Sequence, residues 1–389
     1  MNTGKYVFAQ IASFISANDF NRSVIRYEGN HQVKHFTCWN QLMCMVFGQL
    51  SNCDSLTDLT VGLTAQRSKW YHLGIGTGLS KSNLAHANEN RDWRIFADFA
   101  SILIAEAMVL CRKNSDVLRS IKGNVYAVDS TTVDLCLEVF WWAKFRKHKA
   151  AIKLHTQFDV KASIPTFIDI TDGLTHDVNF LDKIIYEPGA FYIADKGYVD
   201  FKRLHIIHQA AAFFVTRAKD NMNYRRIYSA KVNKAKGLKC DQTIKLNNYY
   251  SAKDYPKKLR RIKYYDQETD NEFDFITNNF QIPALKIALL YKHRWSIELF
   301  FKWIKQHLRI KTFWGYSENA VRIQVYTAII SYLTIAILKE KMNLKQTNYE
   351  ILQILNFSLI DKIPIQQLFD DYYLQNFKEQ KCNQLKFNL

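Results

Sequence analysis

The chain has 389 residues, of which 48% are hydrophobic and 23% are charged, and it contains only 5 prolines and 13 glycines. These proportions are typical of a folded protein and exclude a collagen-like chain or a disordered linker protein. Its 53 lysines and arginines outnumber its 36 acidic residues, and the formal net charge of +17 at pH 7 indicates a polyanionic partner. Nucleic acid is the first candidate, and a basic protein of other function is the alternative.

Cysteine usage and the lack of targeting segments bear on the compartment. The 7 cysteines are an odd number without a Cys-x-x-Cys pair, which argues against a disulfide scaffold and against a cysteine-rich zinc site. The first residues lack a long apolar run with a cleavage site. The most apolar segment, residues 325–338, is too short to span a bilayer and predicts a buried helix. We expect a cytoplasmic, nucleoid-associated protein with no membrane partner.

Residues 1–118 are predicted to form an all-helical N-terminal domain. Apolar residues recur at helical spacing in its first turns, at Val7, Ile11 and Phe14. A glycine-rich break at residues 74–78 precedes Ser80, which has the chemistry of a helix N-cap. A helix, a turn and a capped helix are compatible with a helix-turn-helix, and also with a plain helical bundle.

The hydrophobic period then changes from helical to alternating, which predicts a series of strands. Helices are expected at about residues 176–185 and at 201–209. Three strands with short connections, then strand, helix and strand, predict an α/β fold with a ribonuclease H-like catalytic core. The predicted strands are 124–128, 151–160, 166–170, 190–194 and 212–216.

A basic segment follows the fifth strand. Between Arg217 and Lys263, 15 lysines and arginines stand against 3 acidic residues, and five tyrosines are interleaved. Short alternating runs predict a β-rich insertion, residues 218–272. A charge run is often a solvated face, but this excess favours contact with phosphates. The candidate DNA contacts are Arg225, Arg226, Lys257, Lys258, Arg260 and Arg261.

The remaining elements are a strand at 273–276, a long helix from about Pro283 to Leu308, and an amphipathic helix at 349–359. The last helix lies in a C-terminal segment, residues 339–389. Dimerisation and simple packing are both open as the role of this segment.

Two aspartates directly follow apolar predicted strands, Asp129 in Ala-Val-Asp-Ser and Asp195 in Ile-Ala-Asp-Lys. Neighbouring strand ends would bring the two carboxylates together, and their repulsion would then require a cation. Each aspartate alone could instead be a loop residue or a helix cap.

A third carboxylate, Glu298, lies on the long predicted helix. At about 100° per residue, it shares one stripe with Tyr291, Arg294 and Lys305, with Lys302 nearby. A surface salt-bridge face is the alternative interpretation of this stripe. Three carboxylates form an oxygen-only site that suits two Mg²⁺ ions about 4 Å apart, for which Mn²⁺ can substitute. Arg294 and Lys305 are then expected to hold phosphates.

The spacing Tyr291-x2-Arg294-x3-Glu298-x6-Lys305 resembles the Y-R-E-K signature of bacterial insertion-sequence DDE transposases of the IS-four family. Asp129 and Asp195 match that family's first two catalytic aspartates. The resemblance covers about residues 120–335, and the opening of the chain is similar to the helical N-terminal domain of a subgroup.

The resemblance implies cut-and-paste transposition by a homodimer in a synaptic complex, acting on double-stranded DNA at inverted-repeat element ends and at a target. It implies Asp129, Asp195 and Glu298 as catalytic metal ligands. We expect Tyr291, Arg294 and Lys305 of the signature to contact DNA, together with Lys302, which lies beside them on the helical wheel. Two alternatives remain, another ribonuclease H-like two-metal nuclease and a non-catalytic transposase-derived DNA-binding protein.

The expected domains are an end-recognition domain (1–118), a catalytic core (119–217 and 273–338), the insertion (218–272) and the C-terminal segment (339–389).

Overall fold

The computed structural model describes residues 4–112, 116–136, 138–146, 149–308, 310 and 312–370. The described residues form two compact units. We call residues 1–111, 138–142 and 302–389 the helical unit, and residues 112–137 and 143–301 the sheet unit. These units are not the same segments as the predicted domains, because the N-terminal helices share a unit with the chain from residue 302 onward. The four-domain division stays a prediction.

The described part of the helical unit contains helices and no strands. Most of these helices begin at a serine or threonine whose side chain accepts a hydrogen bond from a backbone N–H of the first turn. The predicted cap at Ser80 is among them and is confirmed. The helices are α1 (Val7–Ala12), α2 (Ala17–Arg26), α3 (Cys38–Leu50), α4 (Leu56–Ala65), η1 (Arg67–Lys69), α5 (Trp70–Leu73), α6 (Lys81–Asn90), α7 (Arg94–Leu110), α13 (Glu318–Lys341) and α14 (Asn348–Ser358).

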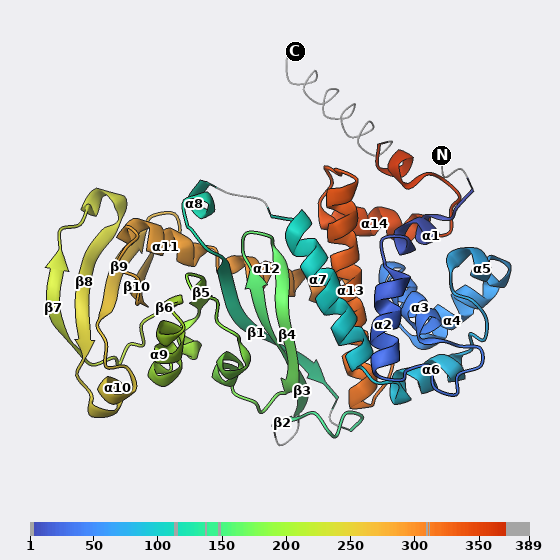
Figure 1. Ribbon diagram of the computed structural model, residues 1–389, viewed down its shortest axis with the longest axis horizontal. Coiled ribbons are helices and arrows are strands. Elements are labelled where there is room, and N and C mark those ends of the chain that lie inside the picture. Colours follow the sequence, from blue (N-terminus) through green and yellow to red (C-terminus); the bar gives the residue numbers. More distant parts are fainter. Residues whose placement is uncertain are drawn as a thin grey trace, which may run out of the picture. The chain divides into compact units, whose positions relative to one another are not determined.

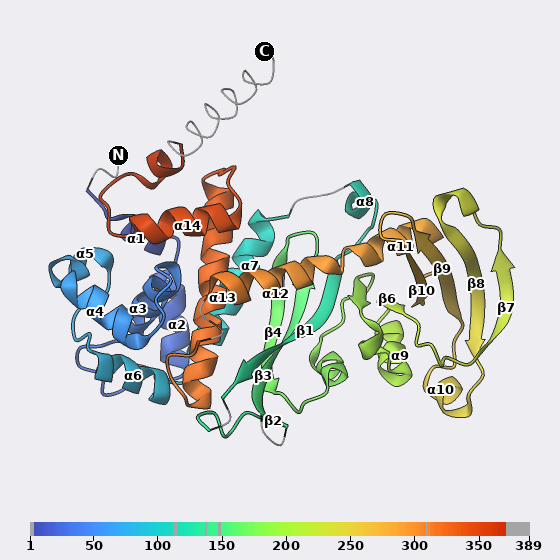
Figure 2. The ribbon, with the colours of Figure 1, turned by 180° about the vertical axis from the view of Figure 1, so that it is seen from behind.

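Helix α13 is the core of the helical unit. It lies side by side with α7 and also contacts α3, α6 and α14 (Figures 1 and 2). Among the described residues it is the one helix long and apolar enough to cross a membrane by length and composition, and 94% of its most apolar window is buried inside the protein. Burial of this kind is what the core helix of a folded domain requires, and the predicted buried helix at 325–338 is confirmed.

The predicted break after α5 is also present. Gly74, Gly76 and Gly78 all have positive φ, and Gly74 ends α5 in the left-handed conformation that glycine adopts without strain. A short helix, this turn and the capped helix α6 therefore follow one another. The predicted C-terminal helix at 349–359 is confirmed as α14, whereas residues 371–389 of the proposed dimerisation segment lie outside the described residues.

The described part of the sheet unit is built on one sheet of ten strands. The order is β2-β3-β1-β5-β6-β10-β9-β8-β7, with β4 paired to β3. Strands β1, β5 and β6 run parallel, and the other pairings are antiparallel. The strands are β1 (Val125–Leu135), β2 (Lys144–Arg146), β3 (Lys149–Asp159), β4 (Ile164–Asp172), β5 (Phe191–Ala194), β6 (Phe213–Arg217), β7 (Tyr224–Ala230), β8 (Leu238–Leu246), β9 (Leu259–Asp266) and β10 (Asn271–Thr277).

The basic insertion extends this sheet. Strand β10 pairs with β6, and β9, β8 and β7 follow outward, so that β7 is an edge strand (Figure 1). The helical segments of the unit are α8 (Asp116–Arg119), η2 (Asp177–Lys183), η3 (Lys196–Tyr198), α9 (Phe201–Gln209), η4 (Lys234–Lys236), α10 (Tyr249–Asp254), α11 (Ala284–Lys292) and the first turns of α12 (Trp295–His307). The α-helix expected at 176–185 is instead the 3₁₀ segment η2. It buries only Phe180 and Leu181, which is little apolar surface to stabilise a longer helix.

The two faces of the sheet are covered by different helices. Tyr126, Val128 and Tyr192 belong to the apolar cluster that packs against α9. On the other face, the Phe158 ring lies 5.3 Å from the Phe300 ring of α12, and Figure 2 shows α11 and α12 running across the strands on that side. Because side chains alternate along a strand, Asp129 faces α12.

Candidate active site

Asp129 lies within strand β1 and not at its end, so the predicted strand end at this residue is wrong. The parallel pairing of β1 with β5 stops at Val128 and Ala194, but β1 continues beside β3, where Asp129 pairs with Thr156. The backbone N–H of Ser130 donates to Asp129 Oδ1 at 2.9 Å. The apolar run before Asp129 ends where β1 stops pairing with β5. The antiparallel pairing with β3 extends β1 beyond that point.

Asp195 directly follows β5, as predicted. The Thr216 hydroxyl of β6 donates to the Asp195 carbonyl at 3.1 Å and holds this strand end in place. The Tyr291 hydroxyl of α11 lies 3.4 Å from Asp195 Oδ1, at the long end of hydrogen bonding. Thr216 was not singled out from the sequence, although a hydroxyl at the end of a neighbouring apolar strand was a usable signal.

The single helix expected from Pro283 to Leu308 is two helices. Helix α11 ends at Lys292 and α12 begins at Trp295, so His293 and Arg294 lie at a break. Pro283 does precede the first helix, as predicted. The helical-wheel geometry that relates Tyr291 to Glu298 is therefore interrupted.

Despite this break, Arg294 contacts side chains of β1, α11 and α12. Its guanidinium lies 3.1 Å from Asp129 Oδ2, forms an ion pair with Glu298, and stands 5.8 Å from the centre of the Tyr291 ring. Arg294 Nε is buried without a hydrogen-bond partner among the described atoms. Arg294 thus joins Glu298 of the predicted stripe to Asp129, while Tyr291 reaches Asp195 through its hydroxyl.

Burial dominates the electrostatics of these groups. The pKa of Asp129 is raised to about 6, chiefly by burial and also by the Glu298 and Asp195 carboxylates, against the opposing effects of the Ser130 N–H and Arg294. Burial also raises the pKa of Tyr291 to about 12, which keeps its hydroxyl protonated at neutral pH. Asp129 and Glu298 share one guanidinium, and the negative charge of Asp195 acts on Asp129, so these carboxylates require a compensating cation.

Arg294 supplies that cation in the present arrangement. Among the residues that the structure describes, no three His, Cys, Asp or Glu side chains are grouped to hold a metal ion. The guanidinium stands where a cation would bind, between the carboxylates of Asp129 and Glu298. Oxygen-only donors are the ligands that Mg²⁺ prefers, so the chemistry of these carboxylates fits a divalent cation, which would take the place of the Arg294 guanidinium.

The two other predicted contacts of the stripe lie further along α12. Lys302 is exposed and Lys305 is half-buried. Both belong to the part of α12 that lies in the helical unit.

The cations of the insertion fall into two groups. Arg225 and Arg226 on the edge strand β7 are exposed, and so are Lys257 and Lys258 just before β9. Arg260 and Arg261 on β9 are instead held by ion pairs with Asp241 and Asp274, respectively. Ion pairing within the sheet unit thus distinguishes Arg260 and Arg261 from the four exposed cations, and the DNA contacts of all six stay a prediction.

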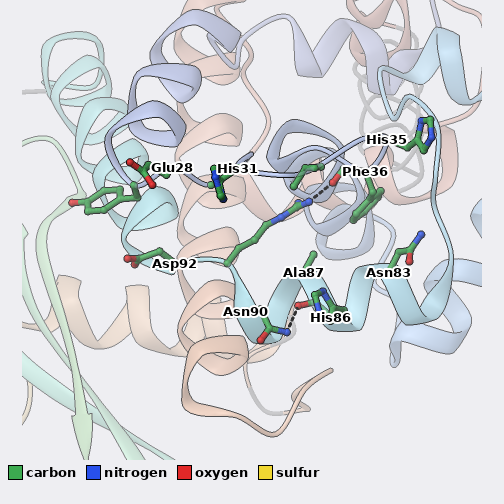
Figure 3. A pocket seen from close by; sticks show the side chains of 13 residues that line it. Glu28, His31, His35, Phe36, Asn83, His86, Ala87, Asn90 and Asp92 are labelled. Atoms are coloured by element: carbon green, nitrogen blue, oxygen red, sulfur yellow. Dashed lines mark hydrogen bonds between the residues drawn. The ribbon is translucent and has the colours of Figure 1, made fainter.

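The helical unit contains a pocket of about 490 Å³ between the α2–α3 connection and α6. Figure 3 shows Asn83, His86 and Asn90 along α6, with His31 and His35 on the other segment. The Arg91 guanidinium crosses it and donates to the Phe36 carbonyl. The pocket gives α6 a polar face made of amide and imidazole side chains.

Comparisons with known proteins match two segments of the chain to described families. Residues 121–334 match the family described as the transposase DDE domain, and residues 3–76 match a domain of unknown function, DUF4372. A protein of Sinorhizobium fredii named "Putative transposase y4zB" is 35% identical over 65% of this chain and 70% of its own length.

Other relatives carry similar names. The "Probable transposase for insertion sequence element IS5377" of Geobacillus stearothermophilus is 28% identical over 63% of this chain and 65% of its own length. The "Putative transposase for insertion sequence element IS4SA" of Synechocystis is 25% identical over 77% and 84%. A solved piggyBac transposase synaptic complex with hairpin DNA covers 93% of this chain and 80% of that chain, with a TM-score of 0.45 and 8% identity. The chain belongs to the DDE transposase family of insertion sequences, enzymes that cut DNA and transfer its strands.

Proposed function

We propose that this transposase cuts at the ends of its insertion sequence and joins them to target DNA at a site formed by Asp129, Asp195 and Glu298. The observation that carries the proposal is that Arg294 joins Asp129 to Glu298, while the Asp195 carboxylate lies near enough to raise the pKa of Asp129. The strand order β4-β3-β1-β5-β6, with β1, β5 and β6 parallel, supports a ribonuclease H-like core. Hydrolysis of one phosphodiester releases a 3′-hydroxyl, and attack by that hydroxyl on target DNA replaces one P–O bond with another.

DDE transposases are generally dependent on divalent metal ions. We infer that the three carboxylates hold two Mg²⁺ ions, which supply Lewis-acid neutralisation of the phosphodiester charge. In that state Asp129 and Glu298 would hold the metal instead of Arg294, whose fork of donors suits a phosphate. Tyr291 stays protonated and orients Asp195 through its hydroxyl.

A direct test of the metal assignment is a calorimetric titration of Mn²⁺ into the full-length protein. The Asp195→Asn variant should bind Mn²⁺ at least about tenfold more weakly than wild type, since a charged oxygen ligand is removed. Asp134→Asn removes an exposed carboxylate from the same strand as Asp129 and serves as the matched control. Equal Mn²⁺ affinity in Asp195→Asn and wild type would remove Asp195 from the metal site.

The exposed cations of the insertion should grip the DNA backbone. Replacing Arg225, Arg226, Lys257 and Lys258 together by Gln should weaken binding to element-end and random duplexes alike. The slope of log affinity against log salt should fall by about 0.9 for each phosphate that is no longer bound. Fluorescence anisotropy at several salt concentrations measures this slope. An unchanged slope would assign the four side chains to solvent.

Helix α6 is our candidate for recognition of the element ends. Asn83 and His86 are exposed on one face of it, and an asparagine amide can read the edge of adenine. Asn83→Ala and His86→Ala should lower the preference for end DNA over random duplex, by about 1–3 kcal/mol for each base that is no longer read. Glu89→Ala, an exposed change on another face of α6, is the control in the same competition assay. An unchanged preference in both test variants would move recognition elsewhere.

The protein is further proposed to act as a homodimer at the nucleoid, with one protomer on each paired end. The double-stranded ends of one element are related by inverted repeats, which favours a two-fold symmetric assembly. Mass photometry of the protein with end DNA should give a complex containing two protomers and two duplexes.

A further inference from the structure

A groove of about 510 Å³ opens in the sheet unit at the end of β6. Its lining is strongly charged, with Arg217, Lys219, Arg261 and Lys263 among the cations and Asp220, Glu272 and Asp274 as the acids. Neither Arg217 nor Lys219 belongs to the stripe or to the exposed cations already described.

Arg217 stands beside Asp195 in the sheet. Strands β5 and β6 are parallel and their pairing ends with Ala194 opposite Thr216, so Asp195 and Arg217 are the next residues on the two strands. Adjacent strands lie about 4.8 Å apart. Arg217, which lines the groove, is therefore a neighbour of Asp195 in the proposed active site.

The Arg217 side chain is held by an aromatic ring. Its guanidinium lies 5.5 Å from the centre of the Phe273 ring, and Phe273 stacks on Phe275 with a ring separation of 5.7 Å. Phe275 in turn contacts Tyr291, whose hydroxyl reaches Asp195. A cation–π contact of this kind fixes the guanidinium plane and leaves its edge donors available to another partner.

The acidic residues of the groove form ion pairs with cations other than Arg217 and Lys219. Asp274 is paired with Arg261, Glu272 with Lys263 and Lys239, and Asp220 with Lys196 at 3.5 Å. Within the described part of the chain, Arg217 and Lys219 form no ion pair. Each acid that lines the groove already has a cation, so these two positive charges are not there to balance it.

We propose that Arg217 and Lys219 bind the DNA backbone at a phosphate close to the bond that is cut. This inference rests on the proposed function, because it takes Asp195 to lie at the cleavage site. Arg217 gives the bidentate contact and Lys219 a second positive charge further along the groove. The competing structural role is that Arg217 only offsets the negative charge of Asp195 across the strand pair.

The test combines protein variants with neutral phosphate analogues. Full-length Arg217→Gln and Lys219→Gln are titrated against a duplex carrying the element end, with Lys202→Gln as the control. Lys202 is an exposed cation on α9, the helix on the opposite face of the sheet. Arg217→Gln should bind roughly 10- to 100-fold more weakly and lower the salt slope by about 0.9, whereas Lys202→Gln should match wild type.

The analogue arm identifies the contact without relying on the variant alone. Single methylphosphonates, which remove the charge of one phosphate, are placed in turn on both sides of the scissile bond. One position should weaken binding of wild type and leave Arg217→Gln unchanged, since both changes delete the same contact. The inference is overturned if Arg217→Gln binds like Lys202→Gln, or if every methylphosphonate penalty is the same in both proteins.

Two further readouts separate this result from misfolding and from failure of the proposed function. Arg217→Lys keeps the charge but not the fork, so it should restore the salt slope while affinity stays below wild type. If Arg217→Lys lost both the salt slope and the affinity and had an unfolding midpoint below wild type, Arg217 would have a structural role. That result would overturn the proposed phosphate contact. Undiminished cleavage by Asp195→Asn would overturn the active-site proposal whatever Arg217 does.

Discussion

Asp129→Asn, Asp195→Asn and Glu298→Gln should each lower nicking of an element-end duplex by about three orders of magnitude or more. Each change removes one charged ligand of the proposed metal site, and Lewis-acid stabilisation of a phosphodiester contributes several kcal/mol to the barrier. Binding of the same duplex should survive, because the exposed cations of the insertion are untouched. Single-turnover nicking in Mg²⁺ beside a gel shift measures both quantities.

The control for this series is Asp134→Asn, which removes a carboxylate from the exposed part of β1. It should nick like wild type. Full nicking by any one of the three test variants would remove that residue from the site. Loss of nicking together with loss of DNA binding would instead point to unfolding, which circular dichroism would reveal.

Arg260→Ala should destabilise the sheet unit by about 3–5 kcal/mol, the cost of leaving a buried ion-pair partner without its counter-charge. The Arg260 side chain is 9% exposed, and two of its nitrogens lie 2.8 Å from the two carboxylate oxygens of Asp241. It also donates to the carbonyls of Asn279 and Ile282, in the segment before α11. Urea unfolding followed by circular dichroism measures the loss.

Lys258→Ala is the matched comparison, because Lys258 is exposed two residues earlier in the chain. It should leave the unfolding free energy within about 0.5 kcal/mol of wild type. Replacing both partners, as Arg260→Met with Asp241→Leu, should recover most of the stability, since neither buried charge then remains. If Arg260→Ala were as stable as wild type and bound DNA more weakly, the ion pair would be incidental and the phosphate role would stand.

The sequence predicted the elements well where the hydrophobic pattern was long and uniform. Residues 201–209 form α9 with the expected bounds, and the apolar run at 325–338 is the buried centre of α13. The apolar run at 190–194 also correctly predicted that Asp195 directly follows a strand, which is β5. Local pattern suffices in these cases because the same few residues decide both the element and its burial.

Prediction failed where a distant partner decides the outcome. Asp129 is in mid-strand because β3, more than twenty residues away, continues to pair with β1. The break at His293 and Arg294 has no proline or glycine to announce it. Arg260 and Lys258 are both basic residues of one run, and only the pairing of β9 with β8 brings Asp241 to Arg260.

The packing of α7 along α13 has a consequence for how the protein is made. Helix α7 ends at Leu110, and α13 is complete only at Lys341. At a translation rate of about 5–20 residues per second, the ribosome adds the intervening residues in roughly 10 to 50 s. During that interval the N-terminal helices lack their central apolar partner, while the strands from β1 to β10 are synthesised before α13 begins at Glu318. The sheet is therefore expected to form first on the nascent chain, and the N-terminal helices are the part exposed to chaperones and proteases until translation has passed α13.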